Sequence, residues 1–248
     1  MRGVILAGGT ATRMRPLTDI TNKHLLPVGR VPMIYHAIAQ FKRAGLRDIL
    51  VVTGRDHMGH MVQQLGSGRQ FGVNFTFKVQ DRAGGIAEAL GLARDFAAGQ
   101  SVAVHLGDNI FEDSVATHVH GYLAQGETGA MIFLKEVPDP ERFGVAELDE
   151  TGRVLSIAEK PSAPKSNLAV TGLYIYDHTV FEVIPHLKPS QRGELEITDV
   201  NNHYVRIGKM KAVRLGGYWT DAGTLESWRH ATELAWSKSF DDLFEKSE

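Results

Sequence analysis

The sequence predicts an α/β fold with a doubly wound, mixed but mainly parallel sheet and an antiparallel extension. In the first half of the chain, short apolar runs alternate with segments whose apolar residues recur at helical spacing. This is the pattern of repeated β-α units. In the second half, strand patterns follow one another closely and are separated by turn signals, which favours antiparallel strands. Because no flexible linker separates the halves, we expect a single domain over residues 1–248.

The first expected strand spans residues 4–7, an unbroken Val-Ile-Leu-Ala run typical of a strand buried on both faces. The run stops at two glycines at 8–9, and Pro16 predicts a long loop rather than an immediate helix. Pro32 is placed to open a helix and Gly45 to stop it. The other strands are short apolar or alternating runs, and the other helices show apolar stripes. We expect strands at 4–7, 48–53, 73–79 and 101–106, and helices at 33–41, 57–65 and 86–96.

The second half begins with four strand patterns of similar length, and an Asp-Glu-Thr-Gly turn signal at 149–152 separates two of them. A last strand and two helices follow, of which the second begins after Thr224, a favourable capping residue. The expected strands are 130–137, 143–148, 154–159, 168–176 and 211–215, and the first of the two helices is 198–207. We expect the chain to fray from about Phe240.

The composition is that of an ordinary globular protein, with 43% hydrophobic and 23% charged residues. The formal net charge of −2 gives no general attraction to nucleic acid or membrane. The chain has no cysteine, which excludes disulfides, thiolate metal sites and a cysteine nucleophile. It begins with a strand and contains no apolar run long enough to cross a bilayer, so we expect it in the cytoplasm.

The loop after the first strand is the strongest candidate for a binding site. Glycines let the backbone approach a ligand closely, and hydroxyls and cations follow them within a few residues. These residues are Gly8, Gly9, Thr10, Thr12, Arg13, Arg15 and Lys23. Free N–H groups and clustered positive charge are how proteins hold a polyphosphate, so we expect a nucleoside triphosphate here. The alternative is a turn that is basic by coincidence; neither a P-loop motif nor a dinucleotide-binding fingerprint is present.

Asp108 and Asp221 are candidate metal ligands. Each lies close to glycines and at an expected strand end, and Asp108 falls at the same edge of the sheet as residues 8–9 and 80–85. Two carboxylates facing a polyphosphate are the protein contribution that Mg²⁺ requires. The alternative is that each aspartate caps a turn or a helix, which is the commoner role beside glycine.

Glu159 and Lys160 close a strand side by side and suggest a sugar-phosphate site. Lys160 would bind the phosphate and Glu159 would accept hydroxyl protons, with Arg192 as a further phosphate ligand. Because adjacent residues of a strand point to opposite faces, both reach one cleft only if the strand has ended; otherwise they form a surface pair. The eleven histidines lack a metal-binding context, and Trp219 belongs either to the core or beside the site.

Seven stretches, in order along the chain, together resemble a known family. They are Leu-Ala-Gly-Gly-Thr-Ala-Thr-Arg-Met-Arg-Pro-Leu-Thr at 6–18, Asn-Lys-His-Leu-Leu-Pro-Val at 22–28, Leu-Gly-Asp-Asn at 106–109, Glu-Lys-Pro at 159–161, Val-Thr-Gly-Leu-Tyr at 170–174, Arg-Gly-Glu-Leu-Glu-Ile-Thr-Asp at 192–199 and Trp-Thr-Asp-Ala-Gly-Thr at 219–224. The chain resembles the glucose-1-phosphate thymidylyltransferases among the sugar-nucleotide pyrophosphorylases, particularly their shorter branch. The resemblance extends from Gly3 to about Ala235.

The resemblance implies a Rossmann-like nucleotidyltransferase that converts dTTP and α-D-glucose 1-phosphate to dTDP-glucose and pyrophosphate, with Mg²⁺, as a homo-oligomer (dimer or tetramer). It divides the chain into a nucleotide-binding part at 1–110, a sugar-phosphate-binding part at 111–225 and a C-terminal helix and tail at 226–248. The implied nucleotide ligands are Leu6, Gly8, Gly9, Thr10, Ala11, Thr12, Arg13, Gln80, Gly85 and Asp108. The implied sugar-phosphate ligands are Asn109, Gly144, Glu159, Lys160, Thr171 and Arg192. The implied metal ligands are Asp108 and Asp221, and Arg13, Lys23 and Lys160 complete the catalytic set.

Two positions depart from the family pattern. Ala11 stands where the family loop usually has glycine, and if this position needs a positive φ, the methyl group costs about 1 kcal/mol. Glu88 replaces a common glutamine on the helix after Gly85. Two alternative functions follow from the resemblance: a uridylyltransferase that uses UTP, and a regulatory subunit that binds nucleotide sugars without catalysis.

Overall fold

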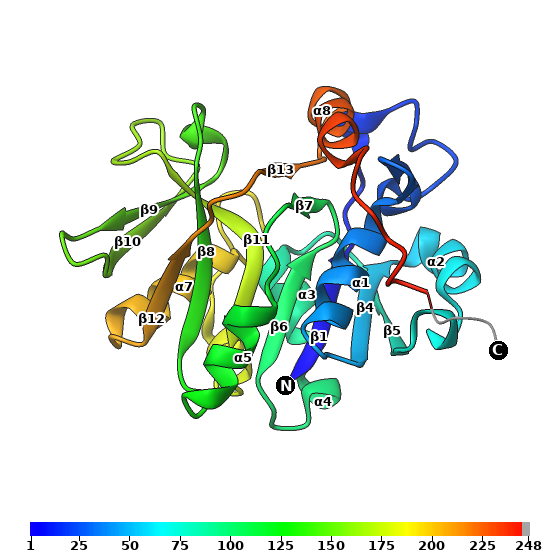
Figure 1. Ribbon diagram of the computed structural model, residues 1–248. Coiled ribbons are helices and arrows are strands. Elements are labelled where there is room, and N and C mark those ends of the chain that lie inside the picture. Colours follow the sequence, from blue (N-terminus) through cyan, green and yellow to red (C-terminus); the bar gives the residue numbers. More distant parts are fainter. Residues whose placement is uncertain (245–248) are drawn as a thin grey trace.

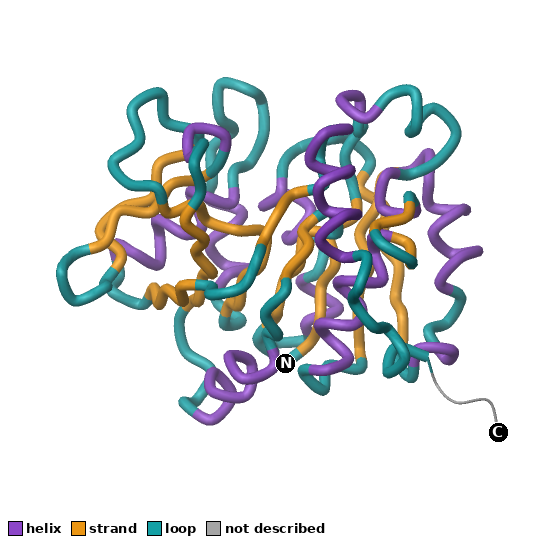
Figure 2. Tube along the Cα trace, turned by 45° about the horizontal axis from the view of Figure 1, so that its top comes forward, coloured by secondary structure: helices purple, strands orange, loops and turns teal. Residues whose placement is uncertain are grey.

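The computed structural model describes residues 1–244 and contains a nine-stranded mixed sheet with helices on both faces (Figures 1 and 2). The strand order is β10-β9-β11-β6-β1-β4-β5, and β8 pairs with β11 and β12. Two small sheets, β7-β13 and β2-β3, lie outside it. The strands are β1 (Arg2–Ala7), β2 (Pro27–Val28), β3 (Val31–Pro32), β4 (Asp48–Gly54), β5 (Asn74–Gln80), β6 (Val102–Leu106), β7 (Asn109–Phe111), β8 (Ala130–Glu136), β9 (Gly144–Leu148), β10 (Val154–Glu159), β11 (Leu168–Tyr176), β12 (Met210–Arg214) and β13 (Trp219–Asp221). The helices are α1 (Met33–Arg43), α2 (Met58–Leu65), α3 (Ile86–Gly91), α4 (Arg94–Ala97), α5 (Ala116–Ala124), α6 (Val180–Val183), α7 (Ile197–Arg206) and α8 (Leu225–Ala235).

β1 lies inside the sheet because both of its faces are apolar. Val4 and Leu6 belong to one core cluster, to which α3, α6 and α7 also contribute. Ile5 and Ala7 belong to the opposite cluster, to which α1, α2 and α5 contribute. β1 pairs in parallel with β4 and β6. The expectation of a strand buried on both faces is therefore confirmed.

β11 joins the two halves of the sheet. It runs antiparallel to β6, β8 and β9, and β10 extends this part through β9. β12 returns parallel to β8. The predicted fold class, an α/β fold with a doubly wound mixed sheet and an antiparallel extension, is confirmed.

Several elements differ from the prediction. The helix expected at 86–96 is two short helices, α3 and α4. α5 and β7 were not predicted, and β13 was expected only as a strand that ends at Asp221. α5 has a weak sequence pattern because it contains a glycine and buries only Val119 and Tyr122. β7 and β13 are three residues each and pair only with each other.

The expectation of fraying from Phe240 is wrong for residues 240–244, and residues 245–248 lie outside the described part. Phe240 and Leu243 are buried in the cluster under α1. Arg43 of α1 forms an ion pair with Asp242 at 2.7 Å. The apolar contacts and this ion pair hold the C-terminal segment against α1, where Figure 1 shows it running down from α8.

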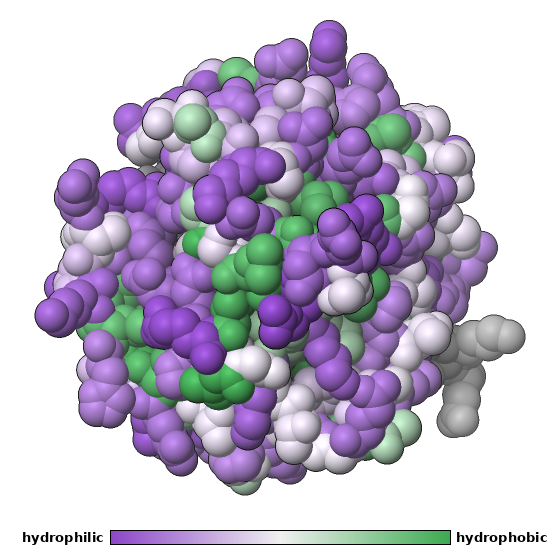
Figure 3. Space-filling view, turned by 90° about the vertical axis from the view of Figure 1, so that its left-hand side faces the viewer, coloured by the Kyte–Doolittle hydropathy of each residue, from purple (hydrophilic) through white to green (hydrophobic). Residues whose placement is uncertain are grey.

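The surface seen in Figure 3 is mostly hydrophilic, with apolar side chains gathered in a stripe through its middle. Large apolar side chains that are exposed on the described surface include Leu155, Ile207 and Trp236. Over residues 1–244, every helix is too short or too polar to cross a bilayer.

The buried histidines predict a loss of stability in acid. Burial lowers the pKa of His36 to about 3 and that of His105 to about 4, from an ordinary value of 6.5. Below that value the unfolded chain takes up protons that the folded protein does not. The free energy of unfolding should therefore fall with decreasing pH, by about 1.4 kcal/mol per pH unit for each histidine between about pH 6 and 4. Urea unfolding across this range measures the slope, and a slope of zero would contradict the assignment.

Candidate active site

The carboxyl ends of β1, β5 and β6 meet at one edge of the sheet and form the first of two adjoining cavities. We call it the strand-end cavity; its volume is about 230 Å³. Its walls are Leu6, Gly8, Gly9, Lys23, His24, Gln80, Ala83, Gly85, Ile86, Ala89, Leu106, Asp108 and Glu194. The expectation that Gly8-Gly9, the 80–85 segment and Asp108 meet at one edge is confirmed.

The loop after β1 contains a strained residue at the predicted position. Ala11 adopts a left-handed conformation with φ 49° and ψ 31° and precedes a 3₁₀ turn at Thr12–Met14. Its carbonyl accepts hydrogen bonds from the Met14 N–H at 3.0 Å and from the Thr18 hydroxyl at 3.0 Å. Met14 is fully buried. The turn and the buried methionine hold Ala11 in a conformation that favours glycine.

Lys23 reaches the cavity from a second 3₁₀ turn, Lys23–Leu25. Asn22 caps this turn by accepting the His24 N–H at 2.9 Å, and its amide donates to the carbonyl of Ala7 at the end of β1. The Lys23 ammonium lies 2.5 Å from Asp108 Oδ2. Burial alone would raise the pKa of Asp108, but the Lys23 ammonium and hydrogen bonding to the carboxylate hold this pKa well below its usual range. Asp108 is therefore a carboxylate.

The β7-β13 pair brings the second aspartate to the first. Asp221 pairs with Asn109, and the Ala222 N–H donates to the carbonyl of Asp108 at 2.7 Å. Burial and the nearby negative charge of Asp108 raise the pKa of Asp221, and the cations of Arg142 and Arg13 oppose the shift. Two carboxylates thus approach each other between cationic side chains.

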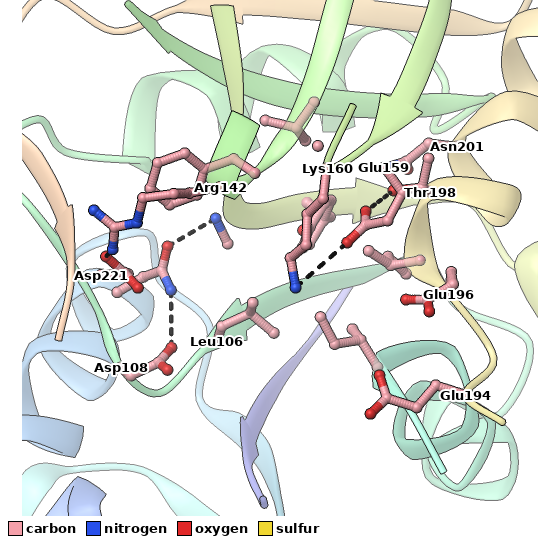
Figure 4. A pocket seen from close by; sticks show the side chains of 18 of the residues that line it. Leu106, Asp108, Arg142, Glu159, Lys160, Glu194, Glu196, Thr198, Asn201 and Asp221 are labelled. Carbon is pink, nitrogen blue, oxygen red and sulfur yellow. Dashed lines mark hydrogen bonds and ion pairs between the residues drawn. The ribbon is translucent and has the colours of Figure 1, made fainter. Parts of the chain in front are cut away.

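The second cavity, the central cavity, has a volume of about 440 Å³ and shares Asp108 with the first (Figure 4). Its walls are Arg13, Ile86, Leu106, Asp108, Asn109, Arg142, Phe143, Gly144, Glu159, Lys160, Val170, Gly172, Tyr174, Arg192, Glu194, Glu196, Ile197, Thr198, Asn201, Trp219 and Asp221. Trp219 stands beside the site, with its indole N–H donating to Asn109 at 2.7 Å.

Glu159 and Lys160 both line the central cavity because β10 ends between them. Lys160 has a left-handed φ of 42°, which breaks the alternation of the strand. The Lys160 ammonium lies 3.8 Å from the Glu159 carboxylate, which also accepts the Thr198 hydroxyl at 2.6 Å. Arg192 lies 3.4 Å from Glu159 and 2.9 Å from Glu196. The structure therefore favours the interpretation in which both side chains face one cavity over the interpretation in which they form a pair on the surface.

Most of the predicted site residues lie on these walls. The strand-end cavity includes Leu6, Gly8, Gly9, Lys23, Gln80, Gly85 and Asp108. The central cavity includes Arg13, Asp108, Asn109, Gly144, Glu159, Lys160, Arg192 and Asp221. Thr10, Ala11 and Thr12 line neither cavity, and their contact with a phosphate stays a prediction.

Thr171 is the predicted sugar-phosphate ligand that the structure does not bring to the central cavity. Its side chain is fully buried, and its hydroxyl donates to the carbonyl of Phe133 on β8 at 2.9 Å. Its neighbours Val170 and Gly172 line the cavity instead. The reason is the alternation of side chains along β11.

The wall residues of the central cavity that were not assigned from the sequence include Arg142, Tyr174, Glu196 and Thr198. Tyr174 and Thr198 lie inside the stretches that carry the family resemblance, as does Glu196, so these stretches contained the signal. Arg142 lies outside them, in a 3₁₀ turn at Pro140–Arg142. No motif marked this residue, because its place depends on how the turn between β8 and β9 folds.

Comparisons with known proteins show which proteins this chain resembles. The family model described as nucleotidyl transferase matches residues 2–237. The chain is 45% identical over 235 residues to a glucose-1-phosphate thymidylyltransferase of Xanthomonas campestris pv. campestris, covering 94% of this chain and 80% of that protein. It is 44% identical over 236 residues to one of Neisseria meningitidis, covering 94% and 82%. A crystal structure from Bacillus anthracis, assigned as such an enzyme in complex with a sucrose, has a TM-score of 0.92 and 53% identity over 97% of both chains.

Ala11→Gly should stabilise the fold, because it removes the steric penalty of a methyl group at positive φ. We expect the free energy of unfolding to rise by about 0.5–1 kcal/mol. Ala98 is the matched control, since it ends α4 with the same φ of 49° far from the cavities. Ala98→Gly should give a similar gain in urea unfolding. A loss of stability in both variants would contradict the claim that the methyl group is strained at these left-handed positions.

Proposed function

Because the chain belongs to the nucleotidyl transferase family, we propose that it transfers a thymidylyl group from dTTP to α-D-glucose 1-phosphate. The products are dTDP-glucose and pyrophosphate. The observation that carries the proposal is the junction of the two cavities, which share Asp108 among other residues and carry on their walls cations from separate parts of the chain. These cations are Arg13, Lys23, Lys160 and Arg192. Such a junction suits a reaction between two phosphate compounds.

The nucleoside is proposed to bind in the strand-end cavity. Gln80 and Gly85 would contact the thymine edge, and the Gly8 backbone would approach the ligand. A Cβ on Gly8 would lie 3.0 Å from Gln80 Oε1, and one on Gly85 would lie 2.4 Å from the Leu195 carbonyl oxygen. Gly85 therefore requires glycine for the wall to keep this shape, whereas a side chain at Gly8 would displace the end of the Gln80 side chain.

The glucosyl phosphate is proposed to bind in the central cavity. Lys160 and Arg192 would contact the phosphate, and Glu159 and Asn109 would contact the sugar hydroxyls. The carboxylate of Glu159 is held by Thr198 at 2.6 Å, so it is already oriented toward the cavity. In this arrangement the sugar phosphate would lie next to Asp108.

The proposed reaction is a direct displacement. A phosphate oxygen of glucose 1-phosphate, already anionic at neutral pH, forms a bond to the α-phosphorus of dTTP, and the bond to the pyrophosphate leaving group breaks in line. No proton has to be removed from the nucleophile, so no general base is required. Both reactants are polyanions, and the barrier is largely their repulsion. Positioning and charge neutralisation by the converging cations would therefore supply most of the rate.

Asp108 and Asp221 are the residues that would hold Mg²⁺. Within residues 1–244, no group of three or more histidine, aspartate or glutamate side chains could hold a metal ion. Two carboxylates suit Mg²⁺, whose other ligands are phosphate oxygens and water. Burial and then the negative charge of Asp108 raise the pKa of Asp221. The metal would supply further neutralisation of the phosphates.

UTP is the alternative donor substrate. Gln80, on the proposed base-binding wall, lies 3.5 Å from Glu88, which replaces the common glutamine of the family. A coupled assay of pyrophosphate release with dTTP and with UTP, each with glucose 1-phosphate, decides between them. Release of pyrophosphate with neither triphosphate would favour a regulatory subunit that binds nucleotide sugars without catalysis.

We also expect the protein to be a homo-oligomer in the cytoplasm. Cell fractionation would test the location, and analytical sedimentation would test the assembly.

Replacing either proposed metal ligand should lower turnover. Asp108→Asn and Asp221→Asn each remove one negative charge from the junction, and we expect kcat to fall by roughly 100-fold or more. Steady-state rates at saturating MgCl₂ measure the loss. Unchanged turnover in either variant would remove that residue from the metal site.

Lys160→Met should act mainly on the sugar phosphate. Loss of the ammonium removes a charge-assisted contact to the phosphate, so KM for glucose 1-phosphate should rise by roughly tenfold or more, while KM for dTTP changes little. Lys165→Met is a matched control, because Lys165 pairs with Glu147 at 2.8 Å on the surface. A Lys160→Met enzyme impaired for dTTP alone would show that the lysine serves the other substrate.

A further inference from the structure

Arg142 connects two carboxylates on different parts of the chain. Its Nη1 lies 2.6 Å from Oδ2 of Asp139, the residue that precedes the 3₁₀ turn, and its Nη2 lies 3.5 Å from Asp221 Oδ1 on β13. The guanidinium carbon lies 5.1 Å from the centre of the Phe143 ring. One end of the guanidinium is thus held firmly, and the other makes a long ion pair with Asp221.

Arg142 also separates two cavities. Beyond the central cavity lies an outer cavity of about 720 Å³. Its walls are Arg13, Val137, Pro138, Asp139, Arg142, Phe143, Trp219, Thr220, Asp221, Thr224, Leu225, Glu226, Ser227 and His230. Arg142 and Asp221 line both cavities. A guanidinium in this wall can therefore face a ligand in the central cavity without leaving Asp139.

Two arginines lie near Asp221. Arg142 is the one that forms an ion pair with it, and a Cβ built on Gly223 would lie 3.0 Å from Asp221 Oδ2 and 3.3 Å from Arg13 Nη2. Asp108 differs, because Lys23 contacts it at 2.5 Å. The pair with Arg142 is the longer of these two contacts and is therefore the easier one to exchange.

We propose that Arg142 binds Asp221 through an exchangeable ion pair and thereby competes with a divalent cation for that carboxylate. Released from Asp221 but still held by Asp139, the guanidinium would face the phosphate in the central cavity. This inference rests on the proposed function, because it assigns Asp221 to the metal. It gives the turn between β8 and β9 a direct part in assembling the site.

The test uses Arg142→Gln in the full chain, with MgCl₂ as the probe and no substrate present. The thermal midpoint is followed against MgCl₂ at constant ionic strength, since binding to the folded state raises it. The dissociation constant for Mg²⁺ that is fitted to this rise is called the MgCl₂ midpoint here, and removing a competing cation should lower it by about threefold, the effect of one exposed ion pair. KM for glucose 1-phosphate should rise by roughly tenfold, because a phosphate contact is lost.

Arg153→Gln is the matched control. It removes the same charge from an exposed pair, Arg153 with Asp149 at 3.2 Å, in the turn between β9 and β10. It should leave the MgCl₂ midpoint and KM as in the parent. Arg142→Lys keeps the charge but lacks the planar fork that contacts two carboxylates at once, so it should shift both quantities in the same directions by less. It also serves if Arg142→Gln does not fold.

The outcomes separate this inference from the proposed function. If the parent protein responds to MgCl₂ and the MgCl₂ midpoint of Arg142→Gln is unchanged or higher, the proposed competition is wrong. The proposed metal site then stays in place. A parent with no response to MgCl₂ overturns both. A lower midpoint with unchanged KM for glucose 1-phosphate overturns the second step, in which Arg142 turns to the phosphate.

Discussion

Repulsion between two polyanions is the constraint on which the rest of this site depends. In the proposed reaction, a triphosphate and a sugar phosphate must bring negatively charged groups into contact. The chain as a whole carries a formal charge of −2 and offers no general attraction. The neutralising charge has to be local, and the structure has cations on the walls of both cavities, which share Asp108. The fold is best understood as a means of holding cations and carboxylates at that point.

Three features of the chain produce this arrangement. The parallel strands β1, β5 and β6 end at one edge, which brings the glycine loop, Gln80 and Asp108 together. The short β7-β13 pair places Asp221 beside Asn109 and thus next to Asp108. The antiparallel part of the sheet supplies Glu159 and Lys160 at the end of β10. Each feature is local, but the site exists only where all three meet.

Much of this could be predicted from the sequence. The buried β1 run, the order of the β-α units and the position of Asp108 at a strand end follow from periodicity and glycine placement. An energetic cost was expected for Ala11 if its φ were positive, and its φ is positive in the structure. The stretches that carry the family resemblance indicated the roles of the site residues, because composition alone does not distinguish a capping aspartate from a metal ligand.

The remainder depended on contacts between residues far apart in the chain. Thr171 was assigned to the sugar site, but the side-chain alternation of β11 turns it toward Phe133. Arg142 was missed because its partner Asp221 is separated from it by 79 residues. The C-terminal segment was expected to fray, but Phe240 and Leu243 pack under α1. No local pattern encodes such distant pairings.

The most direct test of the central claim is a crystal structure of the protein with dTDP-glucose and Mg²⁺. The account predicts thymidine in the strand-end cavity, glucose in the central cavity and the diphosphate at Asp108 between them. A structure in which dTDP-glucose occupies any other part of the molecule and leaves this junction empty would contradict the account.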